Sequence, residues 1–213
     1  MKTYDQIRVS IVDYGLGNLF SIKHAWNHIG IKAEITSSKD TILNSNLVVL
    51  PGVGAFADAM YSLNSLDLSN TIKEVAQSET FIISICLGMQ LLMSKSYEFG
   101  EHNGLGLIKG EVIKLEKGQN YPIPHIGWSQ IIFSNSKVES NFFLKNISKA
   151  SYFYFIHSYQ VKNANKEEAL CYTNYGKNYF SSIINENNIF GTQFHPEKSG
   201  RAGEKLLLNF LTN

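Results

Sequence analysis

The cysteine at position 86 lies where two kinds of sequence meet. Residues 80–85 form a short, apolar, β-branched run that is typical of a fully buried strand. Residues 87–92 follow with helix formers and apolar side chains at helical spacing, so a helix is expected almost without a loop. Ser84 and Gly88 stand two positions to either side of Cys86. This pattern of small residues around a nucleophile is typical of a nucleophile elbow, a strained strand-to-helix turn where larger neighbours would clash.

The position of Cys86 also suits it chemically to act as a nucleophile. The unpaired N–H groups and the dipole at a helix N-terminus favour a thiolate and, later in a reaction, an oxyanion. The alternative is a buried structural cysteine, because free cysteine is among the residue types most often buried. The local stretch alone leaves both interpretations open.

A second stretch, FGTQFHPEKSG at 190–200, favours catalysis. His195 follows a strand-like run at 189–194, and Glu197 lies two residues further on. A nucleophilic thiol needs a base beside it and a third group that orients the base. A rigid His-Pro-Glu at a strand end supplies both from one place. We therefore expect Cys86, His195 and Glu197 to act together.

Composition excludes several other classes of protein. A chain of 213 residues, 44% hydrophobic, is long enough for one domain, residues 1–213, with a sizeable core. The net charge is +1 and the arginines are only Arg8 and Arg201, which argues against nucleic-acid binding. No apolar run approaches the length of a membrane span, and the polar N-terminus does not resemble a signal peptide.

The two cysteines, Cys86 and Cys171, are too few for a disulfide framework or a zinc site. This usage favours a reducing, cytoplasmic location. Cys171 lies in a strand-like stretch, EEALCYTNY, and we expect it to pack in the core rather than to react.

The order of elements predicts how these residues are positioned. Up to residue 92, strands are expected at 7–12, 31–35, 47–50 and 80–85, and helices up to about residue 30, from residue 55, at about 68–77 and at 87–92. This alternation predicts a parallel sheet with helices on both faces and the nucleophile at the carboxyl ends of the strands. The later part is expected to hold a glycine-rich loop at 97–110, alternating residues at 111–134, strands at 151–161, 168–172, 179–184 and 189–194, and a helix at 199–211.

Six stretches, in order and over essentially the whole chain, resemble the class I (triad) glutamine amidotransferases. They are DYGLGNL (13–19), PGVGAFADAM (51–60), CLGMQLL (86–92), PHIGW (124–128), FYFIHSY (153–159) and FHPEKSG (194–200). CLGMQ and FHPE are specific to that family, whereas DYGLGN, PHIGW and YFIHSY are similar to its histidine-biosynthetic branch. The resemblance implies a three-layer, flavodoxin-like α/β fold with a largely parallel central sheet and a nucleophile elbow.

The resemblance implies hydrolysis of L-glutamine to glutamate and ammonia. Cys86 would attack the amide, His195 would carry the proton and Glu197 would orient His195, with no metal or organic cofactor. The PGVG turn at 51–54 is either an ordinary glycine turn or an oxyanion strand, and the resemblance favours the latter. The oxyanion would then bind the N–H groups of Val53 and Leu87. The residues implied for glutamine binding are Gly52, Gly54, Gln90, Glu98, His157, Ser158 and Tyr159.

In this branch the partner is a (β/α)₈-barrel cyclase subunit, to which the ammonia is channelled. That subunit forms imidazole glycerol phosphate and an aminoimidazole carboxamide ribotide. The residues predicted to face the partner are Asn18, Trp128, Tyr154 and Lys198. For Asn18 a helix cap is the alternative, and Trp128 and His125 are expected on a Pro/Gly-rich turn.

Two alternatives to this function are a related glutaminase that delivers ammonia to another acceptor, such as a cell-surface sugar, and a non-enzymatic scaffold on the same fold. A scaffold should lack a triad member, and all three are present. One residue departs from the family pattern: Ser84 stands where glycine is usual. Serine is small enough for the elbow, so we expect strain or altered tuning rather than loss of activity.

Overall fold

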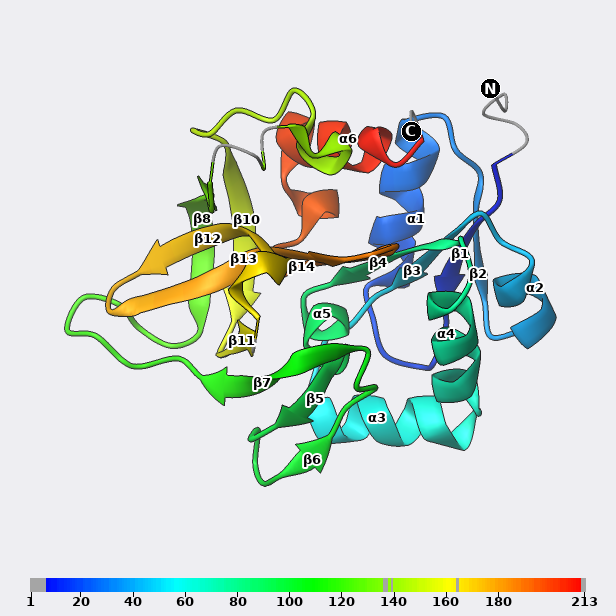
Figure 1. Cartoon of the computed structure of the whole chain (residues 1–213), viewed down its shortest axis with the longest axis horizontal. Coiled ribbons are helices and arrows are strands. Elements are labelled where there is room, and N and C mark those ends of the chain that lie inside the picture. The colour runs from blue at the N-terminus through cyan, green and yellow to red at the C-terminus, as the bar shows by residue number, and fades with distance from the viewer. Residues whose placement is uncertain (1–6, 136–137, 139, 164, 212–213) are drawn as a thin grey trace.

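Among the residues that the structure describes, eight strands form one sheet, in the order β2-β1-β3-β4-β14-β13-β12-β9 (Figure 1). The structure is a computed structural model that describes residues 7–135, 138, 140–163 and 165–211. The expected domain, 1–213, and the polar N-terminus that argued against a signal peptide therefore extend beyond the described residues.

Five of the eight strands are parallel to one another, and Cys86 follows one of them. The neighbouring parallel strands are β2 (Ala33–Thr36), β1 (Val9–Val12), β3 (Leu47–Leu50), β4 (Phe81–Ile85) and β14 (Ile189–Thr192). The antiparallel remainder consists of β13 (Asn178–Glu186), β12 (Ala169–Tyr175) and β9 (Ile132–Phe133). Every residue of β1, β3 and β14 is buried, because a parallel sheet is covered on both faces. The prediction of an α/β fold with a largely parallel central sheet is confirmed.

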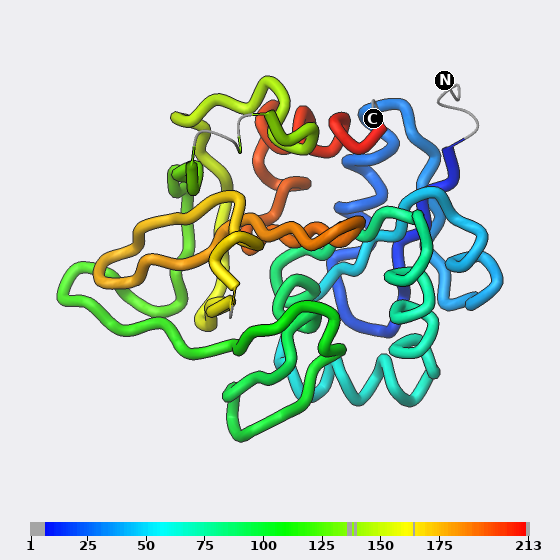
Figure 2. The backbone as a smooth tube through the Cα atoms, in the orientation of Figure 1, coloured from blue at the N-terminus to red at the C-terminus, as the bar shows by residue number. Residues whose placement is uncertain are grey.

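Helices cover both faces of the sheet and enclose two hydrophobic cores. Ile82 and Ile83, neighbours in β4, belong to opposite cores because side chains alternate along a strand. The helices on the Ile83 side are α1 (Leu19–His28) and α6 (Gly200–Asn209). Those on the Ile82 side are α2 (Lys39–Leu43), α3 (Phe56–Ser65), α4 (Leu68–Ala76) and α5 (Leu87–Leu91). The backbone trace shows α1 and α6 together above the sheet, with α3, α4 and α5 below it (Figure 2).

Two smaller sheets flank the carboxyl ends of the parallel strands. One has the order β11-β7-β5-β6, and the other is a two-stranded ribbon of β8 and β10. Their bounds are β5 (Met93–Ser96), β6 (His102–Asn103), β7 (Ile108–Lys114), β8 (His125–Gln130), β10 (Tyr152–His157) and β11 (Tyr159–Asn163). The short 3₁₀ helices are η3 (Phe142–Leu144), η4 (Lys166–Glu168) and η5 (Pro196–Lys198).

The prediction of one continuous strand at 151–161 is wrong. The chain changes sheets at Ser158, because β10 pairs with β8 whereas β11 pairs with β7. Each half of the aromatic run thus has its own partner strand. The residues at this break, 157–159, line the cavity described below.

The expectation that His125 and Trp128 lie on a turn is also wrong, because both are in strand β8. Trp128 pairs with Tyr154 and His125 with His157 across the ribbon. Gly127 adopts a φ of +138° within the strand, so the glycine that suggested a turn is accommodated in the pairing instead. Helix α2 and strand β5 were not predicted from the sequence either.

Candidate active site

Cys86 lies at the strand-to-helix junction in strained backbone geometry, with φ +55° and ψ −108°. Its N–H donates to Thr192 O at 2.7 Å, which ties the turn to the neighbouring strand β14. A Cβ atom on Gly88 would lie 2.1 Å from Leu50 O, and one on Gly52 would lie 2.6 Å from Gly88 N. The start of α5 therefore packs directly against the end of β3, and only glycine fits at the contact. This is the geometry of a nucleophile elbow.

Ser84 is buried in the elbow strand, and its hydroxyl has no hydrogen-bond partner among the described residues. It pairs with Leu50 on one side and Gly191 on the other. A buried hydroxyl without a partner costs about 1–3 kcal/mol of stability. The serine thus fits the space, and its unpartnered hydroxyl is expected to lower the free energy of unfolding.

His195 follows β14 and is held from both sides. Its backbone N–H donates to Tyr154 O at 2.9 Å, and its Nδ1 lies 2.7 Å from Oε1 of Glu197 in η5. Both side chains are buried, 4% and 1% exposed. Because a carboxylate only accepts, Nδ1–H is the donor, and Nε2 of the neutral ring is left as the basic atom. That Nε2 is buried and has no hydrogen-bond partner among the described residues.

The electrostatics of the site favour a charged imidazole. Burial alone would lower the pKa of His195, but attraction to Cys86 and Glu197 outweighs it and raises the pKa to about 10. At neutral pH the raised pKa favours the protonated, imidazolium form of His195. A cationic imidazole next to a cysteine is the kind of neighbour that favours nucleophilic cysteine chemistry.

Cys86 and His195 open onto one cavity of about 280 Å³ at the carboxyl ends of the parallel strands. Its other lining residues are Val53, Gly54, Leu87, Gln90, Glu98, Pro124, Ile156, His157, Ser158 and Tyr159. Such a cavity accommodates a small polar molecule beside the thiol.

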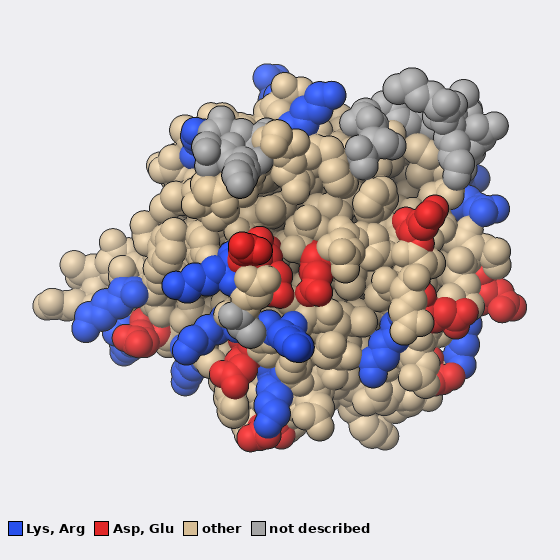
Figure 3. All heavy atoms as spheres, viewed as in Figure 1, with Lys and Arg blue, Asp and Glu red and all other residues tan. Residues whose placement is uncertain are grey.

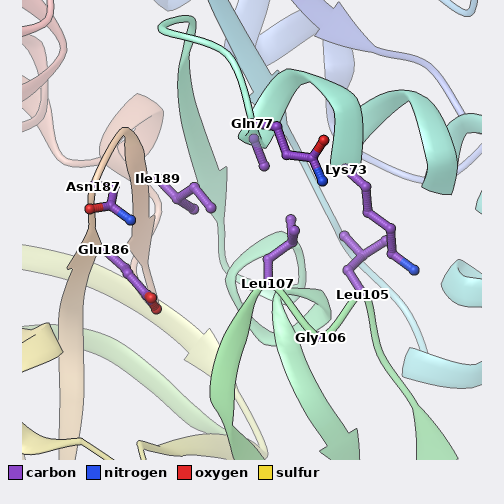
Figure 4. A pocket seen from close by; sticks show the side chains of 9 residues that line it. Lys73, Gln77, Leu105, Gly106, Leu107, Glu186, Asn187 and Ile189 are labelled. Carbon is purple, nitrogen blue, oxygen red and sulfur yellow. The ribbon is translucent and has the colours of Figure 1, made fainter.

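A larger cavity, of about 390 Å³, lies elsewhere, between α4, the loop at 105–107 and the β13–β14 turn (Figure 4). Ile189, which lines it, is the first residue of β14, whereas Thr192 at the other end contacts Cys86. This cavity is therefore at the opposite end of the strand from the nucleophile, and no triad residue lines it.

The family model for glutamine amidotransferase class-I matches residues 10–213. The chain belongs to the class I glutamine amidotransferase family. Its curated relatives include "Imidazole glycerol phosphate synthase subunit HisH 1" of Legionella pneumophila (strain Lens), 43% identical over 209 residues, covering 95% of this chain and 98% of that one. The subunit HisH of Aquifex aeolicus (strain VF5) is 44% identical over 205 residues, covering 96% of each chain. The amidotransferase thus groups with the glutaminase subunits of imidazole glycerol phosphate synthase.

Solved structures agree on the fold. A structure described as "Crystal structure of glutamine amidotransferase" has a TM-score of 0.73 at 15% identity, covering 96% of this chain and 97% of that one. PurLQS from Thermotoga maritima has a TM-score of 0.69 at 21% identity, covering 97% and 98%. At such identities the likeness extends to the fold alone. The prediction of an amidotransferase fold is confirmed.

Six of the seven residues predicted to bind glutamine line the amidotransferase's cavity, and Gly52 does not. Gly52 lies against Gly88 and Leu87 instead, so its role is close packing of the PGVG turn on the elbow. Glu98 lines the cavity and also accepts the backbone N–H of Phe56 at 2.6 Å, which anchors it to the first turn of α3. Burial raises the pKa of Glu98, and the Phe56 N–H partly opposes that shift.

His157 is held as a neutral ring by a chain of hydrogen bonds. Its Nδ1 donates to Tyr159 O at 2.7 Å, so its Nε2 accepts from Nδ1 of His125 at 3.0 Å. Nε2 of His125 then accepts from the Ser129 hydroxyl at 2.9 Å. Burial lowers the pKa of His157 to about 3 and that of His125 to about 4. His157 therefore lines the cavity as a neutral ring.

Two residues at the site were missed by sequence reasoning. The Tyr14 hydroxyl donates to Pro51 O at 2.7 Å and so anchors the start of the PGVG turn. Burial, with the nearby charge of Cys86, raises the pKa of Tyr14. Gln193 is fully buried and its amide contacts Cys86. Its position two residues before His195, at the end of the strand-like run expected at 189–194, was the available signal.

Three of the four predicted partner residues lie together. The rings of Trp128 and Tyr154 have centroids 6.1 Å apart, and Lys198 Nζ lies 6.0 Å from the Tyr154 ring. Asn18 directly precedes α1, and its side chain makes no capping bond to that helix. The cap alternative for Asn18 is therefore wrong.

The outer face of the β8–β10 ribbon is apolar and exposed. It carries Trp128, 55% exposed, together with Ile126, Tyr152 and Ile156. On the face of the molecule that Figure 3 shows, by contrast, lysines and acidic residues are interspersed without a large patch of one sign. Among the described residues, no group of His, Cys, Asp and Glu could hold a metal ion. None of the described helices is long and apolar enough to cross a membrane.

Proposed function

We propose that this chain hydrolyses L-glutamine through Cys86, as the glutaminase subunit of an imidazole glycerol phosphate synthase. The observation that carries the proposal is the juxtaposition of Cys86 on its elbow with the buried His195–Glu197 pair at one cavity. The thiol proton passes to His195 Nε2, and the sulfur forms a bond to the amide carbon. The imidazolium then gives its proton to the leaving ammonia, and water hydrolyses the thioester with His195 as the base.

The oxyanion of the tetrahedral intermediate is assigned to the backbone N–H groups of Val53 and Leu87. Both residues line the cavity beside Cys86. Gly54, with φ +96°, gives the peptide after Val53 a conformation that favours glycine. Rotation of this peptide offers a means of switching the hydrolysis on, because one oxyanion donor is worth about 10²–10³ in rate.

Recognition of glutamine is assigned to Gln90 and Glu98. Both amide hydrogens of Gln90 are used, one by Tyr159 O and one by Gln193 Oε1, each at 3.1 Å. Only the amide oxygen of Gln90 is therefore available to the substrate, as an acceptor for an ammonium or amide N–H group. The carboxyl group of Glu98 supplies the charge that complements the substrate's α-ammonium group.

The ammonia is assigned to a (β/α)₈-barrel cyclase that docks on the outer face of the β8–β10 ribbon. Ile156 supports this assignment, because it belongs to that face and also lines the cavity. A partner seated there covers the mouth of the site and receives ammonia before it is protonated by bulk water. Lys198, next to both the triad and Tyr154, is placed to sense the partner.

The test is ammonia release from glutamine by the chain together with the cyclase. Cys86→Ala should abolish release, whereas Cys171→Ala should retain it because Cys171 is buried in the opposite part of the sheet. A glutamine-mimicking electrophile should label Cys86 alone. Release that persists in Cys86→Ala would overturn the proposal. If the chain instead copurifies with a sugar-modifying partner, the proposed ammonia acceptor is wrong, but the proposed hydrolysis of glutamine stands.

A further inference from the structure

Gln193 is buried against the nucleophile, and its orientation is set by neighbours on the far side from the sulfur. Tyr159 O can only accept a hydrogen bond, so the atom of Gln90 that faces it at 3.1 Å is the amide nitrogen. The second hydrogen of that nitrogen donates to Gln193 at 3.1 Å, which fixes the acceptor there as Oε1. The Nε2 group of Gln193 is left to face Cys86 Sγ, at 3.7 Å.

The contacts of Cys86 Sγ differ in which protonation state they favour. Ile156 O lies 3.7 Å from the sulfur and can only accept, so it favours the neutral thiol, which has a hydrogen to donate. Gln193 Nε2 can only donate, so it favours the thiolate. Gln193 and Gln90 are 0% and 4% exposed, and in such a dry site a fixed amide dipole acts more strongly than it would in water.

We infer that Gln193 stabilises the Cys86 thiolate and that Gln90 holds the Gln193 amide in the orientation this requires. When the thiol proton moves to His195 Nε2, the electron pair left on sulfur accepts the Gln193 N–H. When that pair forms the bond to the amide carbon, the hydrogen bond weakens. Gln193 therefore favours formation of the nucleophile and contributes little to substrate binding. The inference rests on the proposed role of Cys86.

The decisive variant is Gln193→Met, which keeps the length of the side chain and removes the donor. In the complex with the cyclase, kcat for glutamine hydrolysis should fall about 10- to 100-fold with KM changed less than threefold, the loss expected for a hydrogen bond to a charged group. The alkylation of Cys86 by iodoacetamide should require a pH about one to two units higher. Gln193→Glu should cost more, because it places a second acceptor or a negative charge beside the sulfur. The matched control is Gln77→Met on the exposed end of α4.

A second variant keeps the inference testable if Gln193→Met fails to fold. Gln90→Met leaves Gln193 in place but removes the donor that orients it, so the alkylation profile should shift in the same direction by a smaller amount. An unchanged profile and kcat in a folded Gln193→Met chain, or an unchanged profile in Gln90→Met, would overturn the inference. Activity that survives in Cys86→Ala would instead overturn the proposed function, so the two failures are distinguishable.

Discussion

At the scale of single residues, the site separates three buried histidines by their partners. His195 has a carboxylate partner and a raised pKa, whereas His125 and His157 have only neutral partners and lowered pKa values. The difference follows from what each ring faces, because all three are buried. The same site thus contains one histidine whose charged form is favoured and two that are held neutral.

The triad predicts an order of kinetic losses. His195→Ala should lower kcat for glutamine hydrolysis nearly as much as Cys86→Ala, because nucleophile and base act as a unit. Glu197→Gln should cost less, because the imidazole remains but loses its charged partner. Ammonia release by the complex measures all three. A larger loss in Glu197→Gln than in His195→Ala would mean that these roles are misassigned. Supplied with free ammonium, each variant should support normal synthase turnover.

The neutral His125–His157 pair predicts a loss of stability in acid. Their folded pKa values, about 4 and about 3, are below the unfolded value of 6.5. Their contribution to stability is therefore present above pH 6.5 and is lost as the pH falls towards 3. Each ring adds a slope of up to about 1.4 kcal/mol per pH unit. Urea unfolding at several pH values between 7 and 4 gives the free energy of unfolding as a function of pH. This free energy should fall less steeply with decreasing pH in His125→Gln than in wild type. The exposed His24→Gln is the control, and equal slopes in all three chains would contradict the prediction.

At the scale of elements, the elbow depends on how closely α5 approaches β3. The Leu50 carbonyl and the Gly88 backbone are in direct contact, and Gly52, in the turn that follows β3, completes the fit. Cys86 owes its strained conformation to this contact and to its bond with β14. The nucleophile is therefore positioned by the packing of three elements.

Two substitutions at the elbow should have opposite effects. Gly88→Ala should destabilise the chain by about 3 kcal/mol or more and abolish glutaminase activity, because its Cβ would lie 2.1 Å from Leu50 O. Ser84→Ala should be neutral or stabilise by up to about 1 kcal/mol, because it removes a hydroxyl without a partner. Thermal and urea unfolding measure both. Destabilisation by Ser84→Ala would show that the hydroxyl has a partner in solution.

At the scale of the whole molecule, strand β10 connects the triad to the exposed apolar face. Tyr154 O accepts the His195 N–H, and Ile156 O faces Cys86 Sγ, while the side chains of the same residues belong to the outer face of the ribbon. A partner that docks on this face therefore contacts the strand that holds both reacting residues. Under the proposed docking, the partner would be placed to control hydrolysis.

If the cyclase docks on the outer face of the β8–β10 ribbon and switches on the site, the chain alone should hydrolyse glutamine slowly. Trp128→Ala should weaken binding to the cyclase about 10- to 100-fold, as for a central aromatic residue of an interface. Lys198→Ala should reduce the stimulation of glutaminase turnover with the fold intact. Tyr61→Ala, an exposed tyrosine on α3, is the control. Turnover is measured for the chain alone, with cyclase, and with cyclase plus its nucleotide ligand. If the chain alone hydrolyses glutamine as fast as the liganded complex, regulation of hydrolysis by docking is excluded.

The sequence by itself determined the elbow, the His-Pro-Glu segment and the alternation that builds the parallel part of the sheet. These features are local, since strand, turn and helix preferences over a few residues set them. The tertiary structure decided the change of sheet at Ser158, the strand that holds Trp128, and the contacts of Gln193 and Tyr14 with the site. Each of these depends on a partner far away in the chain, and a hydrogen bond between distant residues leaves no periodic pattern in a single sequence.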